Sequence, residues 1–161
     1  MFNVALVRIL VDGYSLLHSW PRLASGKARH SRAAREELIN RLTLYRDAVG
    51  TPITIFFDGS GARSGISITP STPELEVLYS KPGQTADDMI ERTAHRIRPY
   101  GEVLVVTDDY AERDTVISLG GMASSCDNFI RDIHATLADL RGELKSHNLR
   151  ERNKFNRARH A

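Results

Sequence analysis

Short apolar runs alternate along the chain with longer segments in which apolar residues recur at helical spacing. Residues 4–11 are apolar and rich in β-branched side chains apart from Arg8, which predicts a strand buried on both faces. Similar runs predict strands at residues 53–57, 75–79, 103–107 and 122–125. Apolar residues three or four positions apart predict helices at residues 31–49, 85–98, 127–140, and between Asp109 and residue 119. Glycine and proline predict loops at residues 13–30 and 59–73.

This alternation of strands and helices predicts an α/β fold. Successive strands joined through helices form right-handed crossovers, which give a three-layer α/β/α domain with a mostly parallel central sheet. We expect the strand order 3-2-1-4-5, in which the first and fourth strands are neighbours where the order reverses. Ligands bind at the carboxyl ends of the strands in such sheets, especially at the point of reversal.

Acidic residues stand at this expected edge of the sheet. Asp12 follows the first strand, Asp58 the second, and Asp108 and Asp109 the fourth. Carboxylate ligands without cysteines or spaced histidine pairs favour Mg²⁺ or Mn²⁺, and a divalent cation offsets the repulsion among crowded carboxylates. We therefore expect a metal site here, with Asp108 and Asp109 both as candidate ligands. The alternative is that some of these acids cap turns or helices.

A further acid comes from the helix predicted at residues 85–98. At about 100° per residue, Asp87 lies at the boundary of the apolar face that must pack on the sheet, whereas Asp88 lies almost opposite that face. Asp88 also stands three residues after Thr85, the position of a capping acid. Asp87 is therefore the candidate site residue of the two.

Composition limits the class of protein. The 161 residues suffice for one domain, and the single cysteine, Cys126, excludes a disulfide framework and cysteine-rich zinc sites. The N-terminus lacks a secretory pattern, and no apolar stretch is long enough to cross a membrane. We expect a cytoplasmic protein.

Charge is distributed unevenly along the chain. Residues 141–161 contain seven Lys/Arg and two Asp/Glu, a net charge of +5, whereas the other 140 residues contain 15 Lys/Arg and 18 Asp/Glu, a net charge of −3. A basic tail on an acidic body suits a polyanionic partner, although a solvated terminal helix is the commoner explanation. We expect a domain of residues 1–140 followed by a basic tail, helical or flexible, of residues 141–161.

A second basic segment follows Asp12. Residues 13–35 contain five Lys/Arg and no acid. Cations beside metal-binding acids are what a nuclease needs to hold a phosphate backbone. The candidates for phosphate contacts are Arg29, Arg32, Arg35 and Lys81. Tyr14 and Trp20 are candidates for stacking on unpaired bases, although Trp20 beside a proline suits packing better.

Five motifs along the chain point to a known family. They are Val-Asp-Gly-Tyr (11–14), His-Ser-Trp-Pro (18–21), Phe-Phe-Asp-Gly (56–59), Tyr-Ser-Lys-x-x-x-Thr-Ala-Asp-x-x-Ile-Glu (79–91) and Val-Thr-x-Asp-Tyr-x-Glu (106–112). In this order they resemble the YacP-like branch of the NYN domain family, part of the PIN-like ribonuclease superfamily. The resemblance covers about residues 8–140, and Thr-Ala-Asp-x-x-Ile-Glu is its most specific part. The basic tail lies outside it.

The resemblance implies a metal-dependent endoribonuclease that acts on single-stranded RNA through metal-activated water. Carried over to this chain, it implies that Asp12, Asp87 and Asp109 hold Mg²⁺ or Mn²⁺ and that Asp58 supports them. Ser15 stands where the family usually has Asn, at a position expected to contact substrate or metal.

Two other positions depart from the family pattern. Asp108 stands where a small polar residue is expected and brings an additional negative charge into the site, and Arg113 replaces a common Gln.

Three functions compete at this stage. The main hypothesis is cleavage of single-stranded RNA, with mRNA on the ribosome as a candidate substrate, by a monomer or weak dimer that needs no membrane. The second is a non-catalytic RNA- or ribosome-binding module with the same fold. The third is a nucleotide phosphohydrolase that uses the same acids.

Overall fold

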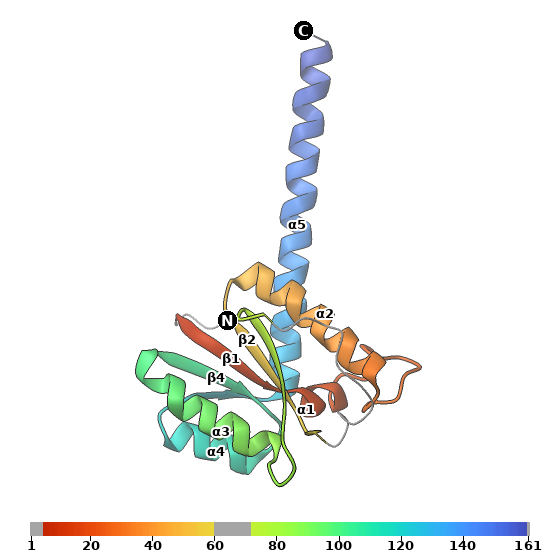
Figure 1. The fold of residues 1–161 in the computed structure, drawn as a ribbon. Helices are drawn as coiled ribbons and strands as arrows, with labels where there is room; N and C mark the ends of the chain where they lie inside the picture. Colours follow the sequence, from red (N-terminus) through yellow and green to blue (C-terminus); the bar gives the residue numbers. More distant parts are fainter. Residues whose placement is uncertain (1–4, 60–71, 161) are drawn as a thin grey trace.

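The computed structural model describes residues 5–59 and 72–160. In these residues a five-stranded sheet has the order β3-β2-β1-β4-β5, and every neighbouring pair is parallel. The strands are β1 (Leu6–Asp12), β2 (Ile53–Phe57), β3 (Leu75–Tyr79), β4 (Glu102–Val106) and β5 (Met122–Ser124). The predicted order is confirmed, and β1 and β4 are neighbours where it reverses (Figure 1).

Helices cover both faces of the sheet. They are α1 (Gly13–His18), α2 (Arg32–Val49), α3 (Ala86–Ile97), α4 (Tyr110–Ser118) and α5 (Cys126–Arg159), with a short 3-10 helix at Arg98–Tyr100. α1, α2 and α5 pack on one face, and α3 and α4 on the other (Figure 1). Along β1, Ile9 and Val11 belong to the first core and Leu10 to the second, so this strand is buried on both faces as predicted.

The first helix corrects part of the expected loop at residues 13–30. The Asp12 carboxylate accepts a hydrogen bond of 3.2 Å from the Ser15 backbone N–H and so caps α1, whose Leu16 is fully buried. Gly13 is the first residue of this helix. A glycine fits there because a Cβ would collide with the Phe57 ring. A helix of six residues is too short to show apolar periodicity, so the pattern did not reveal it. The other expected loop, at residues 59–73, lies largely outside the described residues.

The last helix continues past residue 140, where the sequence pattern placed its end. Its 34 residues bury Phe129, Ile130 and Ile133 in the first half, whereas residues 138–160 are exposed and project away from the sheet (Figure 1). Gly142 does not interrupt the helix, because one glycine in a helix interior costs only about 1 kcal/mol. No helix in the described part of the chain combines the length and apolar character needed to cross a membrane.

Candidate active site

The carboxyl ends of three neighbouring strands bring acids from separate parts of the chain to one edge of the sheet. Asp12 is the last residue of β1, and Asp58 follows β2, which pairs with β1 on one side. Asp108 and Asp109 come soon after β4, which pairs with β1 on the other side. α3 packs against β1 and β2, so its first turn carries Asp87 to the same edge.

Asp12, Asp87 and Glu112 form a compact group of carboxylates from β1, α3 and α4. One oxygen of each lies within 4.8 Å of the others. Oxygens that share one Mg²⁺ at about 2.1 Å lie roughly 3 to 4 Å apart, so small side-chain movements would bring this group around a single cation. The sequence pattern placed Asp12 and Asp87 at this edge and did not identify Glu112.

Glu112 is only 3% exposed. It lies four residues before the buried Val116, so both side chains face the sheet from α4. When Glu112 is ionised, neither of its carboxylate oxygens has a hydrogen-bond partner in the described part of the chain. The Thr107 side chain lies near enough to lower the pKa of Glu112, but the pair does not meet hydrogen-bond geometry. A charged side chain on the apolar face of a helix was the signal for this residue. Its position three residues after Asp109 suggests a capping acid instead.

Burial and mutual repulsion oppose ionisation of these carboxyl groups. Burial raises the pKa of Glu112 to about 9, and Asp87 adds to the effect. Burial also raises the pKa of Asp12 to about 6, although the Ser15 N–H acts to lower it. A divalent cation would supply the positive charge that the group lacks and would satisfy the buried oxygens of Glu112. The residues therefore fit Mg²⁺ or Mn²⁺.

Asp109 adjoins this group and caps α4. One of its carboxylate oxygens accepts hydrogen bonds from the backbone N–H groups of Ala111 at 3.0 Å and Glu112 at 3.3 Å. Its negative charge also contributes to the raised pKa values of Asp12 and Asp87. Asp109 therefore caps a helix, one of the two alternatives that the sequence left open, and its charge acts on the neighbouring carboxyl groups.

Two further acids hold the start of α3. Asp58 Oδ1 accepts a hydrogen bond of 2.9 Å from the Ala86 N–H. Asp88 and Thr85 form a capping box, in which each side chain accepts a hydrogen bond from the other's backbone N–H. Of the two acids in the first turn, Asp87 therefore lies in the group with Asp12 and Glu112, and Asp88 forms the cap.

Asp108 forms structural hydrogen bonds, whereas we expected it to be a metal ligand. One carboxylate oxygen accepts from the Cys126 backbone N–H at 2.9 Å, and the other accepts from the Ser19 hydroxyl. Its own N–H donates to Ser15 Oγ at 3.0 Å. Burial acts to raise the pKa of Asp108, but these hydrogen bonds outweigh it and the pKa is lowered. Asp108 therefore ties the end of β4 to α1 and α5, and Ser15 helps to hold both Asp12 and Asp108.

The expected phosphate-binding arginines differ in their availability. Arg35 is 8% exposed and donates hydrogen bonds to the His30 carbonyl at 2.8 Å and to the Tyr14 hydroxyl at 3.3 Å. Its guanidinium therefore stabilises the segment before α2 and is not presented to solvent, which corrects the expectation for this residue. Arg29 and Arg32 are exposed, and each contacts a neighbouring surface side chain.

The aromatic rings expected to stack on bases are packed within the protein. The Tyr14 ring lies 5.0 Å from the Phe57 ring and 4.5 Å from the His30 ring, measured between centroids. Trp20 is 6% exposed and meets His134 edge-on. Trp20 is thus a core residue, the alternative that its neighbouring proline favoured.

Lys81 lines an open cleft beside the acids. The cleft has a volume of about 580 Å³ and is bordered by Asp58, Gly59 and residues 80–85. Its volume lies in the range of sites that bind small molecules. Lys81, one of the four residues expected to contact phosphate, therefore lines the same cleft as Asp58, which stands at the acidic edge of the sheet.

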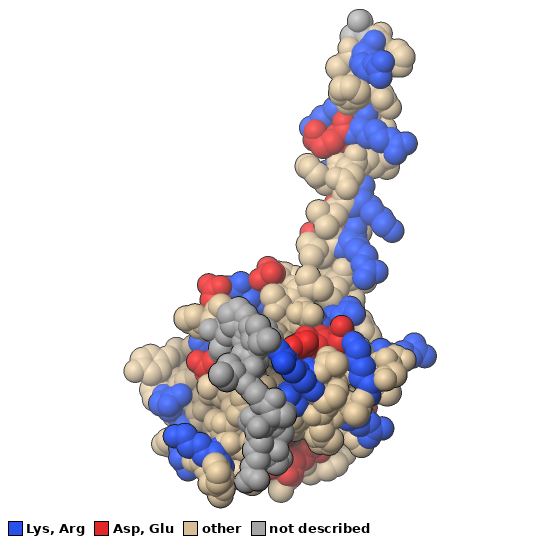
Figure 2. Space-filling model, turned by 45° about the vertical axis from the view of Figure 1, so that its right-hand side comes forward, with Lys and Arg blue, Asp and Glu red and all other residues tan. Residues whose placement is uncertain are grey.

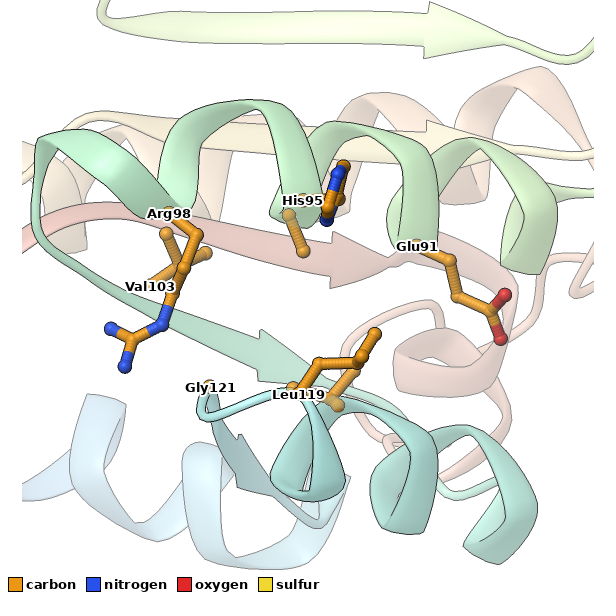
Figure 3. Close-up of a pocket in the computed structure, with 8 residues that line it drawn as sticks. Glu91, His95, Arg98, Val103, Leu119 and Gly121 are labelled. Carbon is orange, nitrogen blue, oxygen red and sulfur yellow. The ribbon is translucent and has the colours of Figure 1, made fainter.

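A second hollow lies elsewhere, where α3 faces α4 and the start of β5 (Figure 3). It is lined by Glu91, Ala94, His95, Arg98, Val103, Val116, Leu119 and Gly121. Its volume of about 30 Å³ leaves room for one or two water molecules, so it is too small for a nucleotide.

Comparisons with known proteins agree with this architecture. The uncharacterized protein YacP of Bacillus subtilis is 29% identical over 126 residues, which cover 78% of this chain and 74% of that protein. The crystal structure of Rae1 (YacP) from Bacillus subtilis matches with a TM-score of 0.72 at 26% identity, over 86% of this chain and 79% of that one. The structure of its W164L mutant gives 0.74 at 25% identity, over 88% and 83%.

A family-level match covers most of the sequence. Residues 9–160 match the YacP-like NYN domain, so the match includes the basic tail, which the motifs did not reach. NYN domains belong to the PIN-like nuclease superfamily, which agrees with a cluster of acids at the carboxyl edge of a parallel sheet. The chain therefore belongs to the YacP-like NYN domain family.

Proposed function

We propose that this protein is a Mg²⁺- or Mn²⁺-dependent endoribonuclease that cleaves single-stranded RNA. The observation that carries the proposal is the group of Asp12, Asp87 and Glu112, in which one oxygen of each lies within 4.8 Å of the others. Membership of a nuclease superfamily supports the same class of reaction. Asp109 adjoins the group and is the candidate fourth ligand, and Asp58 supports it.

The bound cation would act as a Lewis acid on the scissile phosphate and stabilise the charge that develops there. The protein's own residues fix the ligands in place. The Ser15 N–H orients Asp12, and Asp109 caps the helix that carries Glu112. Because the pKa of Glu112 is about 9, this residue holds a proton at neutral pH until a cation displaces it.

The cleft beside Asp58 is the proposed path for the RNA strand. Lys81 lines this cleft and supplies a positive charge next to acids that would otherwise repel a phosphate backbone. An open cleft admits the interior of a strand as well as its ends, which suits cleavage within the chain. Arg29 and Arg32 are exposed and are the candidates for further phosphate contacts.

The basic tail, residues 141–161, is proposed as a second RNA contact, separate from a catalytic unit of residues 1–140. α5 begins where the Cys126 N–H meets Asp108, beside the site. At 1.5 Å per residue, Arg141 lies about 22 Å and Arg159 about 50 Å from that start along the helix axis. Lys and Arg side chains line this projecting half of α5 (Figure 2). An RNA that reaches both regions must be large, which suits mRNA held on a ribosome in the cytoplasm, bound by a monomer or weak dimer.

The proposal is tested by incubating a 5′-labelled single-stranded RNA with the full chain in Mg²⁺, in Mn²⁺ and in EDTA. We expect internal cleavage with either metal, none in EDTA, and a loss of at least a hundredfold in rate for Asp12→Asn and Glu112→Gln. Asp114→Asn is the matched control, because Asp114 is exposed on the same helix as Glu112.

Each rival function has its own outcome in this assay. RNA binding that persists without cleavage in any metal would replace the enzyme with a binding module. Release of phosphate from mononucleotides, with RNA left intact, would identify a phosphohydrolase. Cleavage at the wild-type rate by Asp12→Asn and Glu112→Gln would remove the proposed metal site.

A further inference from the structure

We infer that Tyr110 is a stacking platform for an unpaired RNA base at the rim of the acidic site. This inference deepens the proposed function and rests on it. Tyr110 is the first residue of α4 and directly follows Asp109, the cap of that helix. It is nevertheless 77% exposed, and its ring packs in neither hydrophobic core of the described chain.

One face of the Tyr110 ring is already covered by a cation. The Arg113 guanidinium carbon lies 4.4 Å from the ring centroid, the geometry of a cation–π contact. The high exposure of the ring leaves its other face open to solvent. A base that stacked there would complete a sandwich of guanidinium, phenol ring and base, and each layer of it is planar and polarisable.

Arg113 also supplies positive charge at this rim. The acidic cluster repels a phosphate backbone, so RNA needs positive charge close to where its bases bind. The Arg113 charge reaches the neighbouring Asp108, and its Nε is buried without a hydrogen-bond partner in the described residues. The guanidinium is thus partly enclosed beneath the ring, with its charge next to Asp108.

The start of α4 relates the platform to the site. Glu112, in the first turn of α4, reaches Asp12 and Asp87. Tyr110 begins the same helix directly after Asp109, whose charge acts on Asp12 and Asp87. A strand whose phosphate lies at the acids would therefore have a neighbouring base within reach of the exposed Tyr110 ring. The other aromatic residues expected to stack, Tyr14 and Trp20, are already packed against protein rings.

The test measures binding in EDTA, so that it does not depend on cleavage. Single-stranded RNAs that carry 2-aminopurine at successive positions are titrated with the full chain, and fluorescence quenching reports stacking. We expect quenching at one position and roughly tenfold weaker binding by Tyr110→Ala, the loss of about one stacked base. Tyr110→Phe keeps the ring and should bind as the wild type does.

Tyr100→Ala is the matched control. Tyr100 is 80% exposed, but it precedes β4 and so lies at the opposite edge of the sheet. Wild-type affinity and quenching in Tyr110→Ala would overturn the inference, as would equal losses in Tyr100→Ala. Binding as weak in Tyr110→Phe as in Tyr110→Ala would also contradict it, because stacking needs the ring and not the hydroxyl. Failure of cleavage in the metal assay would instead count against the proposed function and leave this binding result standing.

Discussion

Asp87 and Glu112 face each other from α3 and α4, with one carboxylate oxygen of each within 4.8 Å of the other. Asp87 adds to the burial that raises the pKa of Glu112, so Glu112 is the partner that holds the proton. The pKa of Asp87 is also raised by burial, but the hydrogen bond from Glu112 acts to lower it. Two acids in this relationship are poorly stabilised at neutral pH, and a divalent cation is the species that would relieve both of them.

The first prediction concerns stability in EDTA. The pKa of Glu112 rises from 4.5 to about 9 on folding, and that of Asp12 rises from 3.8 to about 6. Between these limits the folded protein holds protons that the unfolded chain has released, so stability decreases as pH rises through the window. We expect the melting temperature of the wild type to fall from pH 5 to pH 9.

Glu112→Gln should remove the upper part of this pH dependence. Without the titrating carboxyl group, the variant should melt roughly 3 °C or more above the wild type at pH 8, because one unit of pKa shift corresponds to about 1.4 kcal/mol. Thermal denaturation followed by circular dichroism at each pH measures the effect. Asp114→Asn should follow the wild-type curve. Parallel curves for the wild type and Glu112→Gln would show that Glu112 ionises normally.

The second prediction concerns divalent cations. Mg²⁺ or Mn²⁺ should raise the melting temperature in a concentration-dependent way, because a ligand that binds only the folded state stabilises it by mass action, by about 2.7 kcal/mol at a hundred times the Kd. The gain should be larger at pH 8 than at pH 5, where protons compete for the same carboxylates. Calorimetry in buffers of different ionisation enthalpy should detect proton release. A gain of the same size in Asp12→Asn would place the cation elsewhere.

The strand-end acids could be predicted from the sequence because parallel strands end at one edge. An apolar run followed by an acid gave Asp12 and Asp58, and the boundary of an amphipathic helix gave Asp87. The order 3-2-1-4-5 was expected as the common order for a sheet of this kind, and it is confirmed. The spacing of apolar residues and the parallel arrangement of the strands are sufficient to place these acids.

The roles of the remaining residues depend on local geometry that the spacing of residues along the chain does not specify. Glu112 stands at the position of a capping acid, and its place four residues before Val116 did not outweigh that interpretation until its burial was known. Asp108 and Asp109 are adjacent, so the pattern could not tell which of them turns toward Cys126 and which toward α4. The exposure of Tyr110 likewise depends on how α4 sits on the sheet.

The third prediction separates Asp108 from the metal-binding acids. Asp108→Ala removes the acceptor of the Cys126 N–H and the Ser19 hydroxyl, and we expect it to cost about 1 to 2 kcal/mol in the free energy of unfolding. Because the pKa of Asp108 is lowered, this contribution is present at neutral pH and is lost as the pH falls through that pKa. Mn²⁺ affinity should change less than threefold, whereas Asp12→Asn should lose it. A loss of affinity as large as that of Asp12→Asn would make Asp108 a ligand.

The fourth prediction concerns the basic tail. At about 100° per residue, Arg141, Lys145, Arg152 and Arg159 fall within about 40° on one side of α5. If these four contact phosphates, replacing all of them with Gln should weaken RNA binding and lower the slope of log K against log salt by about 3, since each contact with single-stranded RNA contributes roughly 0.7. Cleavage of a short oligonucleotide should be unchanged, because the tail leads away from the acids.

The matched control for the tail is the triple Gln variant of Arg150, Lys154 and Arg157, which lie on the other side of the helix. Of the seven basic residues in the tail, Lys154 alone pairs with an acid in the described part of the chain, Glu151 at 3.2 Å. The control should therefore retain most of the affinity and of the salt slope. Equal losses in both variants would mean that the tail attracts RNA by its total charge and that no particular side of the helix is used. Unchanged binding in both would exclude the tail as an RNA contact.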